Sequence, residues 1–99
     1  MKLLTQTLRN RFEQIGRQDE SPDPIVVCKF FDPTGSWTWY ATEFDGDDTF
    51  FGYVVGFAKE LGYFSLRELS EVKGRFGLGI ERDLHFDECK LSEIPEYHR

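Results

Sequence analysis

Long apolar runs are missing from this chain of 99 residues, and so is the pattern of a secretory signal. The longest apolar run, Phe50–Ala58, has nine residues and includes two glycines, whereas a membrane-spanning helix needs about 20 apolar residues. The opening segment Met1–Leu4 gives way at once to the polar Thr5–Thr7, which is too short an apolar region for a signal peptide. These absences predict a cytoplasmic protein that makes no contact with a membrane.

Cysteine and histidine are scarce. Cys28 and Cys89 lie far apart and form no CxxC pair, so the spacing of a zinc site is absent. Cys28 lies within the apolar run Ile25–Phe31 and is expected to be a buried thiol, while a disulfide between the two cysteines stays open. His85 and His98 are the only histidines, and no Ser–His–Asp set has informative spacing. The sequence therefore gives no support for nucleophilic hydrolysis, and we expect no cofactor.

Basic residues are fewer than acidic ones: 12 Lys and Arg stand against 18 Asp and Glu, a net charge of −6. Residues 1–18 carry +3, which leaves −9 for residues 19–99. A general nucleic-acid-binding domain has a basic face on its main body, so direct binding of nucleic acid is not expected. An acidic body serves solubility, and it also fits a protein that meets a basic protein surface.

Aromatic residues are abundant, and the ten Phe, four Tyr and two Trp can fill the core of one small domain. We therefore expect a single domain over residues 1–99. Its expected parts are an amphipathic N-terminal helix (1–18), a polar, proline-bearing linker (19–24), an α+β body (25–91) and a polar tail (92–99).

Two segments have the pattern of amphipathic helices. In the first, apolar residues recur at helical spacing and Gly16 follows to end the helix; these residues are Leu4, Leu8, Phe12 and Ile15. In the second, Ser65 and Glu68 have the spacing of a capping box, in which the Ser65 hydroxyl accepts from the Glu68 amide and the Glu68 carboxylate reaches back. Gly74 is placed to end this helix, and the residues expected to face inward are Leu66, Leu69 and Val72.

Aromatic and β-branched runs bounded by turn residues predict strands over Ile25–Phe31, Trp37–Phe44 and Thr49–Phe57, with a short fourth strand within Ile80–Phe86. The short connections between the first three strands predict an antiparallel meander. The expected fold class is therefore α+β, with an N-terminal helix, an antiparallel meander of three to four strands, and one short capped helix packed on the sheet.

Aromatic residues alternate along the second predicted strand, which places Trp37 and Trp39 on one face and Tyr40 and Phe44 on the other. Aromatic side chains on both faces indicate that both faces are at least partly covered. An exposed set of such rings could also stack unpaired bases, so binding of single-stranded nucleic acid is one alternative function. Stacking platforms lie in basic grooves, however, and the neighbouring charges are acidic, so core packing is favoured.

One segment carries the residue types of a metal site. If residues 81–88 are extended, Glu81, Asp83, His85 and Asp87 project from one face about 6–7 Å apart. A divalent ion needs several ligands within about 2.0–2.6 Å, so other segments would have to contribute. The same residues also suit a solvated strand edge. A small metal-dependent nuclease or related hydrolase is therefore the alternative function, and no catalytic residue is assigned beyond these four candidates.

A second acidic cluster surrounds the turn after Phe44. Asp45, Asp47 and Asp48 lie in the turn, and Glu43 precedes it. The cluster is too short for a calcium-binding EF-hand loop, which spreads its ligands over twelve positions between two helices. We expect these four carboxylates to be the binding residues of a non-enzymatic interaction protein whose partner is a basic protein surface, without a metal.

Six segments spread over nearly the whole chain form a specific combination: Leu3–Thr5, Val27–Pro33, Trp37–Glu43, Phe51–Tyr53, Glu60–Leu69 and Gly77–Phe86. Together they resemble a prokaryotic family described as domain of unknown function 2958. The resemblance implies a short, stand-alone bacterial protein of a kind often carried on plasmids, phages and other mobile elements, and it brings no established activity or catalytic residue. Some small acidic proteins of such elements inhibit host defence systems, so an accessory or anti-defence role is an expectation by analogy.

Overall fold

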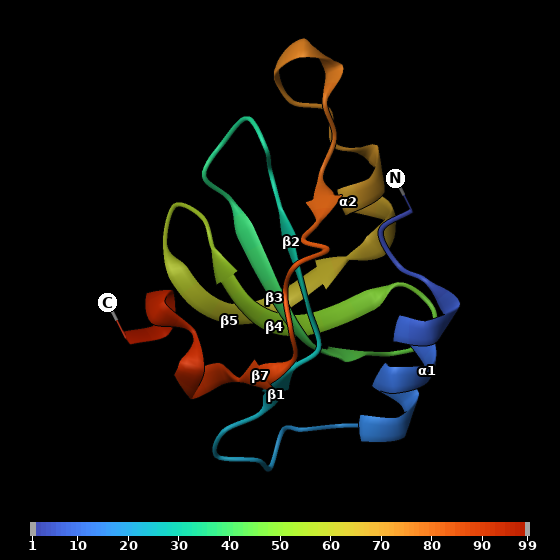
Figure 1. The fold of residues 1–99 in the computed structure, drawn as a ribbon, viewed down its shortest axis with the longest axis vertical. Coiled ribbons are helices and arrows are strands. Elements are labelled where there is room, and N and C mark those ends of the chain that lie inside the picture. The colour runs from blue at the N-terminus through green and yellow to red at the C-terminus, as the bar shows by residue number, and fades with distance from the viewer. Residues whose placement is uncertain (1, 99) are drawn as a thin grey trace.

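The computed structural model describes residues 2–98, except the side chains of Arg75 and His98 (Figure 1). Aromatic and β-branched runs that are separated by short turns pair in it as neighbouring strands. The main sheet is antiparallel with strand order β5-β4-β3-β2-β6, and β1 and β7 form a separate ribbon. The predicted α+β class and antiparallel meander are confirmed. The elements are α1 (Gln6–Ile15), β1 (Ile25–Val26), β2 (Cys28–Phe31), β3 (Thr38–Phe44), β4 (Thr49–Val55), β5 (Lys59–Ser65), α2 (Leu66–Glu71), β6 (Glu81–Arg82) and β7 (Cys89–Lys90), with single 3-10 turns at Arg75–Gly77, Leu91–Glu93 and Pro95–His98.

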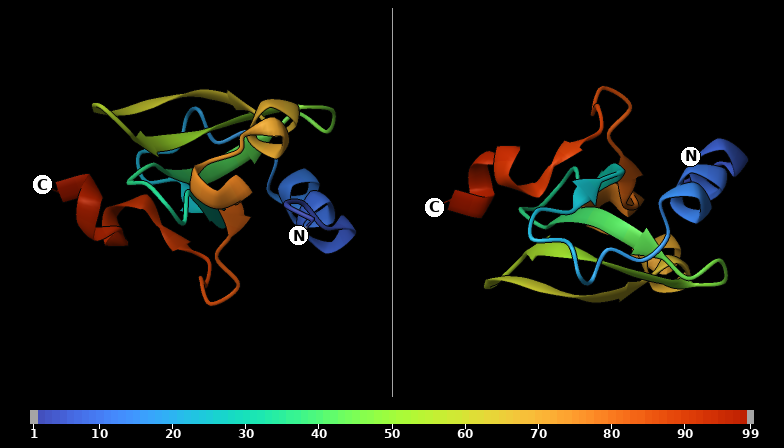
Figure 2. Two further views of the ribbon diagram at one scale, coloured as in Figure 1. Left: turned by 90° about the horizontal axis from the view of Figure 1, so that it is seen from above. Right: turned by 90° about the horizontal axis from the view of Figure 1, so that it is seen from below.

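Two apolar cores lie on the two faces of the main sheet. The first core packs α1 and α2 against the sheet, and its buried members are Leu3, Leu4, Phe12, Val27, Cys28, Phe30, Ala41, Phe50, Leu69 and Ile80. The second core packs β1 and the C-terminal turns against the other face, and its buried members are Val26, Tyr40, Tyr53, Leu91 and Ile94. The tail over 92–99, predicted as polar, therefore contributes Ile94 to a core. Figure 2 shows α1 and the C-terminal turns at opposite ends of the molecule.

α1 is shorter than the helix predicted over residues 1–18. It begins after Thr5, whose hydroxyl accepts a hydrogen bond from the Leu8 N–H (3.2 Å). It ends before Gly16, which has a φ of 72°, so the predicted helix end is confirmed. Leu4 precedes the first turn and is 2% exposed, so the apolar stripe begins outside the helix. None of the helices within residues 2–98 is both long enough and apolar enough to cross a membrane.

The strand predicted over Ile25–Phe31 is divided at Val27. β1 leaves the main sheet to pair with β7, whereas β2 pairs with β3 and β6. Val27 still donates its N–H to the Ala41 carbonyl (2.8 Å), which keeps the chain attached to β3 at the break. The division places Val26 in the second core and Val27 in the first. The residues around the break, Ile25–Cys28, are all apolar and contain no signal for such a change of partner.

A β-bulge in β3 changes the face of Phe44. The register with β4 shifts between Ala41 and Glu43, so Thr42 is the extra residue on β3. Beyond the bulge Phe44 packs with Ala41 against the first core, whereas Tyr40 packs in the second. The prediction that Tyr40 and Phe44 share a face is therefore wrong, because alternation holds only along an unbroken ladder.

β5 was not predicted, although it pairs with β4 along its whole length. Ser65 of β5 faces Thr49 of β4 at one end, and Lys59 of β5 faces Val55 of β4 at the other. Its sequence has no β-branched residue and contains Lys, Glu and Gly, which are depleted from strands. β5 lies at the edge of the sheet and is largely exposed, so it lacks the apolar alternation of a covered strand. The strand predicted within Ile80–Phe86 is present only as the short β6 beside β2.

α2 ends earlier than predicted. Its last residue is Glu71, and Val72 after it is 39% exposed, so Val72 does not face inward. The Gly74 N–H donates to the Leu78 carbonyl (2.6 Å), so Gly74 closes the following loop and does not end the helix. This loop projects from the molecule beside α2 (Figure 1) and carries Phe76, which is 92% exposed.

Candidate functional site

The candidate metal-binding segment, residues 81–88, is not extended. Only Glu81–Arg82 is strand. The chain then turns, because the Asp83 carbonyl accepts from the Phe86 N–H (3.3 Å) and the Asp83 carboxylate accepts from the His85 N–H (2.9 Å). The predicted alignment of the four candidates on one strand face is therefore wrong, since it requires a continuous strand.

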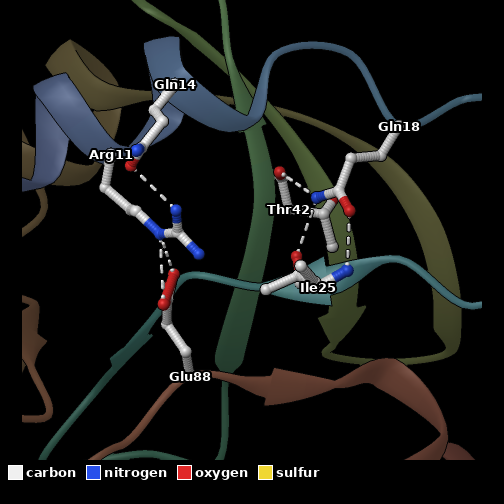
Figure 3. Close-up of polar contacts among 6 residues, drawn as sticks. All are labelled: Arg11, Gln14, Gln18, Ile25, Thr42 and Glu88. Carbon is white, nitrogen blue, oxygen red and sulfur yellow. Dashed lines mark hydrogen bonds and ion pairs between the residues drawn. The ribbon is translucent and has the colours of Figure 1, made fainter.

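Surface ion pairs occupy two carboxylates of this segment. Asp83 lies 3.7 Å from Lys29 Nζ, and Glu88 accepts a hydrogen bond of 2.7 Å from Arg11 Nε, while the Gln14 side chain accepts from Arg11 Nη1 at 2.8 Å (Figure 3). Partly exposed pairs of this kind contribute little to stability but fix orientation. Among the side chains that the structure describes, no group of three or more His, Cys, Asp and Glu is placed to hold a metal ion.

Two buried groups with shifted pKa values, Cys28 and Tyr40, have structural roles. Burial raises the pKa of the Cys28 thiol to about 12, and both Cys28 and Cys89 are free, so the possible disulfide is absent. Burial, and then the hydrogen bond that Tyr40 donates to Glu96 (2.9 Å), raise the pKa of Tyr40. Neither group ionises near neutral pH, so neither can act there as a nucleophile or base. The hydroxyl of Tyr53 donates to the Glu96 carbonyl (3.2 Å), which further anchors the C-terminal turns.

Gln18 attaches the segment after α1 to the bulge in β3. Its side-chain amide donates to the carbonyls of Ile25 (2.8 Å) and Thr42 (2.7 Å), and its side-chain oxygen accepts from the Ile25 N–H (2.7 Å), as Figure 3 shows. The Gln18 backbone N–H donates to the Glu43 carboxylate (2.9 Å). Glu43, one of the predicted binding residues, is therefore part of the fold's own hydrogen-bond network.

Asp45 organises the turn between β3 and β4. Its Oδ1 accepts from the backbone N–H groups of Asp47 (2.8 Å), Asp48 (2.9 Å) and Thr49 (3.0 Å). These hydrogen bonds, first that from Asp47, lower the pKa of the Asp45 carboxyl. Gly46 takes a φ of 90° within the turn, which a larger side chain would strain. The carboxylate of Asp45 is thus ionised and held in one orientation.

Asp48 caps the start of α2, although it precedes the N-cap residue Ser65 by 17 positions in the sequence. Its carboxylate accepts from the Ser65 hydroxyl (2.5 Å) and the Arg67 N–H (2.8 Å), and these bonds, first that from Ser65, lower the pKa of Asp48. The Ser65 hydroxyl accepts from the Glu68 N–H (3.1 Å), which confirms the serine half of the predicted capping box. Asp48 therefore supplies the second acceptor at this helix N-terminus.

The replacement Asp48→Asn is expected to lower the melting temperature at neutral pH, because the amide keeps only one of the two acceptor oxygens. A lowered pKa in the folded state means that the ionised Asp48 stabilises the fold above the ordinary carboxyl pKa, and that this contribution is lost as the pH falls through the folded-state pKa. In thermal unfolding, the difference between variant and wild type should therefore shrink as the pH is lowered from 7 to below the ordinary carboxyl pKa of about 3.9. Asp47→Asn is the control, and an equal effect of both variants would contradict the capping role.

Asp47 and Glu68 complete what we call the acidic corner: Asp45, Asp47, Asp48 and Glu68, where the β3–β4 turn meets the start of α2. Three of the four predicted binding residues belong to it. The fourth, Glu43, shares the lining of one cavity with Asp45, but its carboxylate accepts from the Gln18 N–H at the bulge. Glu68 was missed as a member because its proximity depends on the long-range cap between Asp48 and Ser65.

A second exposed surface lies along β5. Leu61 is 51% exposed and Tyr63 is 77% exposed, and both project from the same side of this edge strand. A cavity of about 240 Å³ beside Leu61 is also lined by Phe51 and Tyr97. Sequence analysis missed this surface because β5 itself was not predicted, although Leu61 and Tyr63 stand at strand spacing.

The fold and these surfaces define a small α+β protein with an acidic corner and an open sheet edge. The chain matches the family described as "Protein of unknown function (DUF2958)" over residues 3–98, nearly its whole length, and it belongs to this family. No curated protein and no solved structure matches the chain. The resemblance inferred from the sequence motifs is therefore confirmed, and the family description assigns no activity.

Proposed function

We propose that the protein is a non-enzymatic binding protein that captures a basic surface of a partner protein through the acidic corner. The observation that carries this proposal is the fixed, ionised state of Asp45 and Asp48, whose carboxylates are held by hydrogen bonds from the fold. Charged groups held in place before binding lose little freedom when a partner arrives. Asp47 and Glu68 add negative charge beside them, and a net charge of −6 favours encounter with a basic partner.

The biological setting forms part of the same proposal. Resemblance to a family of short bacterial proteins of mobile elements supports a role as an accessory factor of such an element. The partners in this proposal are host defence proteins. Defence proteins that act on nucleic acid present basic surfaces, which the acidic corner would contact in place of phosphates. The setting rests on the family resemblance and on charge.

A double charge reversal, Asp47→Lys with Glu68→Lys, is expected to weaken capture of the partner about tenfold, because each change replaces attraction by repulsion at the corner. Asp45 and Asp48 are left intact since both support the fold. The measurement is a pull-down from bacterial lysate with the tagged protein, followed by elution in a salt gradient. The partner should leave the variant at a lower salt concentration than it leaves the wild type.

The matched control reverses two exposed carboxylates elsewhere, Glu20→Lys with Asp87→Lys, which gives the same change in net charge. Partners that are lost from the corner variant and kept by this control support the proposal. Equal loss from both variants would mean that net charge alone is responsible, and unchanged capture by the corner variant would rule out the acidic corner as the binding surface.

A further inference from the structure

The register between β4 and β5 determines which backbone groups of β5 point away from the sheet. The Leu66 N–H donates to the Asp48 carbonyl (2.8 Å) at one end of the pair, and the Gly56 N–H donates to the Ala58 carbonyl (2.9 Å) at the other. Hydrogen-bonded positions alternate along an antiparallel ladder, so every second residue of β5 bonds to β4. The residues between them direct their N–H and C=O groups to the open edge; these are Lys59, Leu61, Tyr63 and Ser65.

This edge has few of the features that prevent strands from pairing. β5 contains no proline and its register with β4 has no bulge, and within residues 2–98 no strand pairs with its outer side. Lys59 is its only basic residue. Leu61 and Tyr63 expose apolar surface beside the outward backbone groups. Natural sheets usually protect an edge of this length by charges, proline or a bulge, so the β5 edge is suited to receive another strand.

Gly62 lies at the middle of β5, and no contact among the described residues requires a glycine there. A Cβ atom built at Gly62 would meet nothing within 4 Å, and its φ is not in the left-handed region. Its cross-strand neighbour Gly52 is different, because a Cβ there would lie 1.9 Å from the Tyr40 carbonyl oxygen. Glycine weakens the interior of a strand and often marks close approach of another backbone. The unexplained glycine therefore points to a second chain beside β5.

We propose that two copies of this chain pair through β5, antiparallel about a two-fold axis at Gly62, so that their main sheets become continuous. In this register Leu61 lies opposite Tyr63 of the second copy and Lys59 lies opposite Ser65 of the second copy. These are the residues whose backbone groups point outward, so each pair exchanges hydrogen bonds. Gly62 meets Gly62 of the second copy at a non-hydrogen-bonded position, where Cα atoms approach to about 4.5 Å.

Charge favours a second copy as the occupant of the edge. Lys59 would lie beside Ser65 of the second copy, whose hydroxyl is bonded to the Asp48 carboxylate, so each copy supplies a cation to an acid of the other. Glu60 faces the apolar Phe64 in this register, and no like charges stand opposite one another. A register centred on Leu61 would place Ser65 opposite Phe57 of the second copy, which lies in the β4–β5 turn outside the strand. This dimer goes beyond the proposed function and does not depend on it.

The first test is the mass of the purified full-length chain by sedimentation over a range of concentrations. The wild type should be a dimer, and Leu61→Lys with Tyr63→Lys should raise the dimer dissociation constant by at least about tenfold, since like charges would face each other across the edge. Leu84→Lys is the control, because Leu84 is 65% exposed in the loop after β6, away from the β5 edge. A wild type that stays monomeric, or a dimer that the double variant leaves unchanged, would overturn the proposal.

The second test fixes the register by crosslinking. Gly62→Cys should form an intermolecular disulfide under mild oxidation, because facing residues at a non-hydrogen-bonded position bring their Cβ atoms within reach of a disulfide. The wild type controls for Cys89, and circular dichroism confirms that each variant is folded. Crosslinking by Leu61→Cys and not by Gly62→Cys would overturn the register centred on Gly62. Absence of crosslinking in both would contradict pairing through β5.

Discussion

Gly52→Ala is expected to destabilise the protein by ~3 kcal/mol or more, a large fraction of the stability of a small domain. The added Cβ would lie 1.9 Å from the carbonyl oxygen and 2.9 Å from the carbonyl carbon of Tyr40. Both are backbone atoms of the neighbouring strand, so no side chain can rotate away to make room. β3 would have to move from β4 beside the bulge at Thr42, which disturbs both cores.

Gly62→Ala is the matched control, because Gly62 lies directly opposite Gly52 on β5 and a Cβ there meets nothing. Removing a strand glycine is expected to leave stability unchanged or raise it by up to about 1 kcal/mol. Urea unfolding followed by tryptophan fluorescence measures both variants, at a concentration low enough to keep the chain monomeric. If Gly52→Ala unfolds at the same urea concentration as the wild type, the close approach of β3 and β4 described above is wrong.

Phe50→Ala is expected to cost about 3–5 kcal/mol of the free energy of unfolding, through lost burial and the cavity left behind. Phe50 is fully buried at the centre of the first core. Its ring centroid lies 4.6 Å from that of Phe44 and 5.3 Å from that of Phe30. The rings of Phe12 on α1 and Phe64 on β5 also contact it, with centroids at 5.8 and 5.2 Å, so this one side chain connects β4 with four other elements.

Phe57→Ala removes the same side chain from the turn between β4 and β5, where Phe57 is 99% exposed and touches only the edge of Trp37 among the aromatic rings of the described residues. Its expected effect lies within about 0.5 kcal/mol of zero. Chemical unfolding of both variants, with a common m-value, gives the comparison. Similar losses in the two variants would show that burial around Phe50 is not the main source of stability.

Features with a local signal were predictable from sequence. The Gly16 helix end, the Ser65 cap and the hairpin order of β2, β3 and β4 all depend on residues within a few positions of one another. Propensity and periodicity report such features because the interactions are made before any tertiary contact. The α+β class follows from the same signals.

Features that depend on distant residues were not predictable. The bulge at Thr42 is supported by Gln18, 24 positions away, and Tyr40 donates to Glu96, 56 positions away. The sequence predicts the acidic turn as a cluster of binding residues, yet Asp48 caps a helix that starts after Ser65. β5 was not predicted for the same reason. An exposed edge strand needs no apolar alternation, because its pairing with β4 holds it in the sheet.

Pairing of β1 with β7 has a consequence for how the chain folds during synthesis. Ile25 lies opposite Lys90, and the second core is incomplete without Leu91 and Ile94. Translation at roughly 5–20 residues per second therefore leaves Val26, Tyr40 and Tyr53 exposed for seconds after they emerge from the ribosome. Contacts of such long sequence separation also slow the final step of folding, so nascent chains offer chaperones a defined apolar surface until the last turns have docked.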